Sequence, residues 1–156
     1  MENIREKASF LKQDYTEVLS KLSADTPHKW GKMNVQQMVE HMSDYVRIAS
    51  GKTPMDIITE ADKLPRAQGF LTSEKTFPEN TPNVLMPDTP PLERHSNLAE
   101  AITELQQELD YFFAAYHADP EKTVDNPFFG SLNFDMQVQL LYKHSTHHLK
   151  QFGAGV

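Results

Sequence analysis

The sequence predicts an all-α fold: a four-helix bundle in a single domain that spans residues 1–156. Four segments carry apolar side chains at steps of three and four residues, which is the pattern of an amphipathic helix. No segment shows the alternation of apolar and polar residues that is typical of a strand. Seven of the ten prolines lie between residues 52 and 95, so a long irregular connection is expected between the second and third helices. A chain of 156 residues can also bury a sizeable apolar core.

The first helix is expected at residues 4–22, where an apolar stripe faces away from several charged side chains. A turn around Pro27 separates it from the second helix. Asn34 is a good N-cap for that helix, because Gln37 stands where the partner of a capping box reaches back. Gly51 supplies the left-handed residue that commonly ends a helix.

Residues 52–95 are expected to hold little regular structure, because the prolines exclude long helices. A short helix is expected near Asp56–Lys63. A long connection in a small domain usually has a function or covers something. In a bundle it also permits a crossover, so the helices on either side of it need not be antiparallel neighbours.

The third helix is expected to begin after Asn97, with Glu100 as its capping partner, and to end before a proline at residue 120. The fourth is expected to begin after Ser131 or Asn133 and to end at Gly153.

Composition excludes several classes of function. The chain has no cysteine, so disulfides, thiolate-rich zinc sites and cysteine nucleophiles are excluded. A net charge of -7 argues against binding to the nucleic-acid backbone. No apolar run approaches the roughly 20 residues that cross a bilayer, and the charged N-terminus lacks an apolar signal core. No membrane association and a cytoplasmic location are therefore expected.

The fourth helix carries the strongest chemical signal. Counted from Gln137 at about 100° per residue, His144 and His148 both fall within about 60° of the centre of the core-facing stripe. Two imidazoles one turn apart on a buried face can share a metal ion. The alternative is a pair of hydrogen-bonded core histidines. His147 lies about 80° from the centre on the same count, so it is expected to flank the pair as a donor to a ligand, at the mouth of the site or in solvent.

A third ligand is needed for most metals, and His41 on the second helix is the best candidate. It lies beside Met38 and Tyr45, at the border between the apolar stripe and the polar face. Such a position can point between two helices or into solvent. The other histidines are weaker candidates, because they lie in loops or at a helix end; they are His28, His95 and His117.

Three segments of the chain together resemble a known family. They are WGKMNVQQMVEHM at residues 30–42, NPFFGSL at 126–132 and HSTHHLKQFG at 144–153. The chain resembles the DinB superfamily, in particular a branch whose last helix carries a His-x-x-His-His-x-x-Gln-Phe pattern. The resemblance implies a four-helix bundle with a long crossover between the second and third helices. It also implies a divalent metal ion held by His41, His144 and His148, and a homodimer, although the spacing of the residues does not require one.

Three functions follow from such a site. Three neutral histidines leave a coordination position open, which is typical of a catalytic ion that polarises a carbonyl or phosphoryl oxygen. The first hypothesis is therefore a metal-dependent hydrolase-like enzyme acting on a small molecule. The second is a transferase or isomerase that activates a low-molecular-weight thiol, which would need a basic pocket. The basic candidates for that pocket are Arg47, Lys52, Arg66 and Lys143. The third is a binding module without enzymatic activity, which would have a closed four-ligand site and no pocket.

The sequence does not identify the metal, and it leaves more than one role for the residues around it. Histidine ligands suit zinc, nickel, iron and copper alike, and zinc or nickel is expected. Gln137 and Gln151 could orient a ligand or form hydrogen bonds in the core, and Tyr45 could be a wall of the pocket or simple packing. Candidate general bases are expected to be solvated carboxylates; they are Glu40, Asp44 and Asp135. Aromatic residues next to loops are expected to plug the ends of the bundle; they are Trp30, Phe128 and Phe129.

Overall fold

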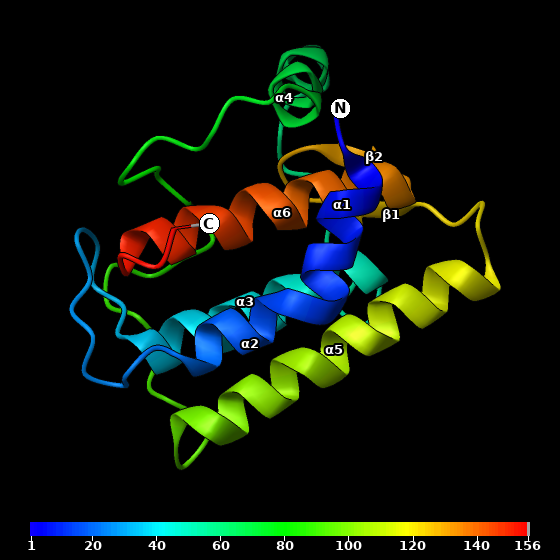
Figure 1. Cartoon of the computed structure of the whole chain (residues 1–156). Helices are drawn as coiled ribbons and strands as arrows, with labels where there is room; N and C mark the ends of the chain where they lie inside the picture. The colour runs from blue at the N-terminus through cyan, green and yellow to red at the C-terminus, as the bar shows by residue number, and fades with distance from the viewer. Residues whose placement is uncertain (156) are drawn as a thin grey trace.

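Most of the chain is helical, and one small antiparallel sheet joins the last two long helices (Figure 1). The computed structural model describes residues 1–155. Its elements are α1 (Ile4–Ser9), η1 (Phe10–Asp14), α2 (Tyr15–Ser20), α3 (Val35–Ser50), η2 (Ala61–Lys63), α4 (Leu64–Thr72), α5 (Leu98–Ala118), β1 (Val124–Asn126), β2 (Gly130–Leu132) and α6 (Phe134–Gln151). The prediction of a mainly helical chain is confirmed, whereas the sheet was not predicted.

The first helical segment contains a π-helical turn, η1, between α1 and α2. The sequence predicted one continuous helix here. Lys7, Leu11, Tyr15 and Leu19 are all buried and follow each other at four-residue steps. In an ideal α-helix each such step turns about 40° too far, so the stripe would drift away from the core. The wider π-turn compensates for this drift, because it holds more residues per turn.

The expected caps are present in the longer helices. Asn34 and Gln37 form the complete capping box at the start of α3, and Gly51 ends that helix with a left-handed φ of 88°. Asn97 accepts a hydrogen bond from the backbone of Glu100 at the start of α5. The N-cap of α6 is Asn133, one of the two predicted candidates.

The short helix predicted at Asp56–Lys63 is displaced along the chain. The structure instead has a 3₁₀ turn at Ala61–Lys63 that continues into α4 at Leu64–Thr72. Pro65 does not interrupt this helix, because it lies in the first turn, where a backbone N–H has no partner in the helix. The predicted bounds were therefore wrong, because Pro65 starts a helix here instead of following one.

The small sheet is too short for strand periodicity to reveal it. Each strand has three residues, and the turn between them is held by Asn126, whose side-chain oxygen accepts from the backbone N–H groups of Phe128 and Phe129. Gly130 follows with a φ of 81°. Three residues contain hardly more than one period of alternation, so the pattern has no room to appear.

Two apolar clusters position the elements. The main cluster joins α2, α3, α5 and α6, and α3 packs mainly along α5 (Figure 1). The second cluster contains Leu71, Phe129, Leu132 and Leu140 and fastens α4 to α6. Within the described residues, none of the helices combines the length and apolar character needed to span a bilayer.

Candidate metal centre

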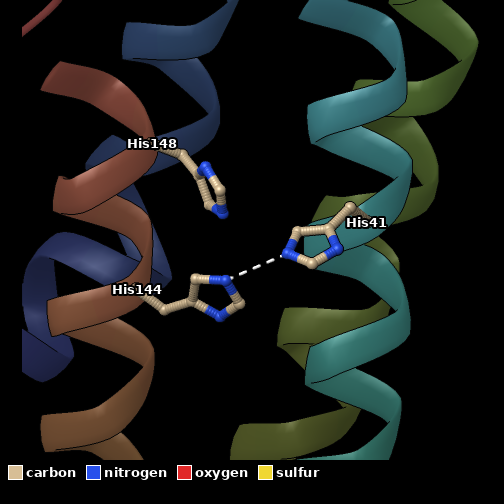
Figure 2. A group of neighbouring side chains, drawn as sticks. All are labelled: His41, His144 and His148. Atoms are coloured by element: carbon tan, nitrogen blue, oxygen red, sulfur yellow. Dashed lines mark hydrogen bonds between the residues drawn. The ribbon is translucent and has the colours of Figure 1, made fainter. Parts of the chain in front are cut away.

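His41 of α3 faces His144 and His148 of α6 across the space between these two helices (Figure 2). One ring nitrogen from each residue lies within 4.8 Å of the other two. The Nε2 atoms of His41 and His144 are 3.0 Å apart. Nitrogen ligands of one tetrahedral zinc ion are about 3.3 Å apart, given Zn–N distances near 2.0–2.1 Å. The three predicted residues therefore come together in a group that can hold a metal ion.

The local structure of α6 explains why both of its histidines point inward. Gln137, Leu141 and Gln151 lie on the same side of the helix and are buried in the core. His148 is itself only 6% exposed. His144 is one turn earlier on the same face and is partly buried. The rotation count from the sequence is consistent with this arrangement.

Hydrogen bonding around His148 leaves one of its nitrogens without a partner. The Nδ1 atom of His148 is 2.8 Å from Oε1 of Gln151, and the Nε2 atom of Gln151 donates to the backbone carbonyl of Trp30 at 2.9 Å. Since an amide oxygen only accepts, Nδ1 of His148 must carry the proton. The lone pair then resides on Nε2, which is buried and has no hydrogen-bond partner. A metal ion is the partner that best satisfies such a nitrogen.

The surroundings keep all three imidazoles neutral at pH 7. Burial lowers the pKa of His41 to about 4, and a charge on nearby His147 would lower it further. Burial, together with the charge that His41 would carry, lowers the pKa of His148 to about 3. The pKa of His144 also falls well below its usual value, because the residue is buried next to the other histidines. Neutral imidazoles present free lone pairs, which is the state that metal ligands require.

His147 lies beside the three histidines and does not join them. Its ring is 5.4 Å from that of Trp30 and 5.9 Å from that of Phe77, measured between centroids. It is partly buried between these aromatic side chains. The structure thus places His148 rather than His147 with His41 and His144.

Gln151 orients the ring of His148, which is one of the two roles that the sequence left open for it. Besides its hydrogen bond to His148, it is in contact with the turn at Gly31. A Cβ atom added to Gly31 would lie 2.6 Å from Nε2 of Gln151, and the φ of Gly31 is 80°. The absence of a side chain at Gly31 therefore lets Gln151 bridge the backbone of Trp30 and the ring of His148.

A cavity of about 620 Å³ opens next to the three histidines. Its wall includes Trp30, Phe128 and Phe129, which the sequence analysis expected to act as plugs of the bundle ends. Phe129 does belong to the second apolar cluster, but its ring also borders the cavity. Phe77 completes the aromatic wall and could not be found from the sequence, because its position depends on the path of the proline-rich connection.

The expectation of solvated carboxylates is wrong for Glu40. This side chain is 3% exposed and accepts from Gln36 and from the backbone N–H groups of Arg94 and His95. Burial alone would raise the pKa of Glu40, but these hydrogen bonds outweigh it and lower the pKa. Glu40 therefore anchors the end of the long connection. Asp44 and Asp135 are exposed as predicted, and neither belongs to the histidine group.

No model of a known protein family matches this chain, and no curated protein matches it. The resemblance to the DinB superfamily thus rests on the residues themselves and stays a prediction.

Proposed function

We propose that this chain is a metal-dependent, hydrolase-like enzyme that acts on a small molecule and has the four-helix bundle of the DinB superfamily. The observation that carries the proposal is the buried, unpartnered Nε2 of His148 beside the facing nitrogens of His41 and His144. These three side chains would hold one divalent ion. Zinc and nickel are the ions proposed here, and imidazole ligands suit iron and copper as well.

The arrangement of the helices supports the proposed bundle. The α1–α2 segment, α3, α5 and α6 supply the main apolar cluster, and the connection that contains α4 joins α3 to α5. In this proposal the connection is the long crossover of the family. It returns along the end of α6 that bears the histidines, where its residues line the cavity.

The residues of the site have distinct roles in this proposal. When bound, the ion would supply a Lewis acid for a carbonyl or phosphoryl oxygen. Gln151 holds the proton of His148 on Nδ1 and keeps Nε2 free. The aromatic wall removes water from the substrate, which strengthens polar interactions inside the cavity. A general base is not assigned, because Glu40 is fully engaged with the backbone and Asp44 is paired with Arg47.

The composition of the ligand group favours an enzyme over a binding module with a structural metal. A structural zinc site usually has four protein ligands. Among the described residues, the group around His41 contains three histidines and no carboxylate. The cavity next to this group is the space that a substrate would need.

Little in the structure favours the alternative that uses a low-molecular-weight thiol. Arg47 forms ion pairs with Asp44, Glu104 and Glu108. The other three basic candidates from the sequence also lie outside the cavity lining; they are Lys52, Arg66 and Lys143. A pocket built to hold the carboxylates of such a thiol would need free cations of this kind.

Metal analysis of three variants tests the proposal. Purified, chelator-free parent protein should contain or take up about one equivalent of zinc or nickel, as expected for one site of this kind. His144→Ala and His148→Ala should each lose it, while His147→Ala should keep it, because its ring lies beside the group without joining it. Circular dichroism would establish that each variant is folded. If the parent takes up no metal at neutral pH, or if His147→Ala loses it as fully as the other two, the proposal is wrong.

A further inference from the structure

The histidines form only part of the cavity wall, and several aromatic side chains form another part of it. These side chains include Trp30, Phe77 and Phe128. The Phe77 ring lies 5.3 Å from Phe70 and belongs with Phe128 to the residues packed on the second apolar cluster. These packing contacts need no ligand, so the positions of Phe77 and Phe128 in the wall are already set by the fold.

Charged side chains are nearly absent from the lining. Among the described residues that line the cavity, only Lys32 and Asp88 carry a full charge at pH 7. Both are exposed, and their charges have opposite signs. The net charge of -7 also disfavours the approach of an anion from solution. Apart from an ion held by the histidines, a charged ligand would therefore lose its hydration without gaining a partner in the cavity wall.

One hydrogen-bond donor lies next to the histidines. The Tyr45 ring is 4.8 Å from the rings of both His41 and His144. Its hydroxyl oxygen accepts from Nδ2 of Asn83 at 2.6 Å, so the hydroxyl hydrogen remains available. A ligand with one acceptor group can use this hydrogen at the end of the cavity that holds the histidines.

We propose that the cavity binds an uncharged aromatic small molecule, with its rings against Trp30, Phe77 and Phe128 and one acceptor group toward Tyr45 and the histidines. Its volume of about 620 Å³ falls within the range of pockets that enclose small ligands. This assignment names the substrate class of the proposed enzyme. It rests on the proposed function only in treating the bound molecule as a substrate.

Two probes with the same aromatic skeleton test the assignment. Phenylnaphthylamine is uncharged, and anilinonaphthalene sulfonate adds one negative charge to a nearly identical molecule. Trp30 is the only tryptophan of the chain and lines the cavity, so excitation of Trp30 and emission from the probe report binding. We expect the uncharged probe to bind one site. After removal of any metal by a chelator, we expect the sulfonate to bind at least about tenfold more weakly, since the side chains of the cavity wall offer a buried charge no partner.

Variants locate the bound probe. Phe77→Ala and Phe128→Ala should each weaken binding of phenylnaphthylamine, whereas Tyr111→Ala should not, because Tyr111 is an exposed aromatic residue on α5. Thermal unfolding would establish that the variants fold. Equal or tighter binding of the sulfonate by the metal-free parent protein would overturn the assignment. So would binding of phenylnaphthylamine that neither cavity variant weakens.

The same titrations carried out after chelation separate this inference from the proposed function. Binding of the uncharged probe without any metal uptake would support the ligand class and remove the metal chemistry. Metal uptake without binding of the probe would leave the proposed function and overturn the ligand class.

Discussion

Replacement of Gln151 by leucine tests whether this residue prepares His148 for a metal ion. Gln151→Leu keeps a similar volume but removes the oxygen that accepts from Nδ1 of His148 and the nitrogen that donates to Trp30. Loss of such a bond to a metal-ligating histidine lowers metal affinity about 10- to 100-fold. This corresponds to about 1.4–2.8 kcal/mol. The variant also leaves buried polar groups unpaired, so the free energy of unfolding should fall by about 1–3 kcal/mol.

The measurement is zinc affinity by competition with a chromophoric chelator at neutral pH, with unfolding by urea measured on the metal-free form. Gln139→Leu is the matched control. Gln139 lies on the same helix and is 1% exposed, but its partners are Lys7, Ser73 and Glu74. The control should destabilise the protein and leave zinc affinity unchanged. The reasoning is refuted if Gln151→Leu binds zinc as tightly as the parent, or if Gln139→Leu weakens zinc binding equally.

Four further predictions concern the surroundings of the site and the connection. Gly31→Ala should weaken zinc binding in the competition assay, as Gln151→Leu does, because the added Cβ would lie 2.6 Å from Nε2 of Gln151. Gly51→Ala is its control. It imposes similar backbone strain at a φ of 88° and should leave zinc affinity unchanged. Glu40→Ala should lower the free energy of unfolding in urea by about 1–3 kcal/mol and keep metal binding, since it leaves two backbone N–H groups unpaired. Tyr116→Phe should cost about 0.5–1.5 kcal/mol in the same assay, because the hydroxyl of Tyr116 donates to the carbonyl of Ala49 at 2.8 Å. The hydrogen bond from Lys7 lowers the pKa of Glu74 to about 2, below its usual value of 4.5. The stability from this pair is thus present above pH 4.5 and lost as the pH falls toward about 2. The Glu74 side chain is 42% exposed, so the loss should stay below about 1 kcal/mol. Acid titration of unfolding should show that Glu74→Gln removes this component.

The features that the sequence predicts well are those that depend on a single helix. The capping box of Asn34 and Gln37 involves neighbouring residues, so its chemistry is visible without knowledge of the fold. The shared face of His144 and His148 follows from the turn angle of one helix and needs no partner helix. In both cases the interacting atoms are separated by three or four residues along the chain.

Features that depend on how distant segments meet are not visible in this way. Glu40 looks like an exposed carboxylate on the polar face of its helix, and it is buried because the backbone of Arg94 and His95 returns to it. The π-turn in η1 is likewise a response to packing, because Lys7, Leu11, Tyr15 and Leu19 must all face one core. From the local sequence pattern alone, the same residues are predicted to form a regular α-helix.

His41 lies between these two cases, and its position explains why the site can be open. The sequence places it at a border between polar and apolar faces, so it can point into solvent or toward another helix. In the structure α3 packs mainly against α5 and makes fewer contacts with α6. The border residues of α3, His41 and Tyr45, therefore face α6 across a space that close helix packing would have filled. The proline-rich connection closes this space with Phe77 and Asn83, so the connection is part of the proposed binding site and not only a link between two helices.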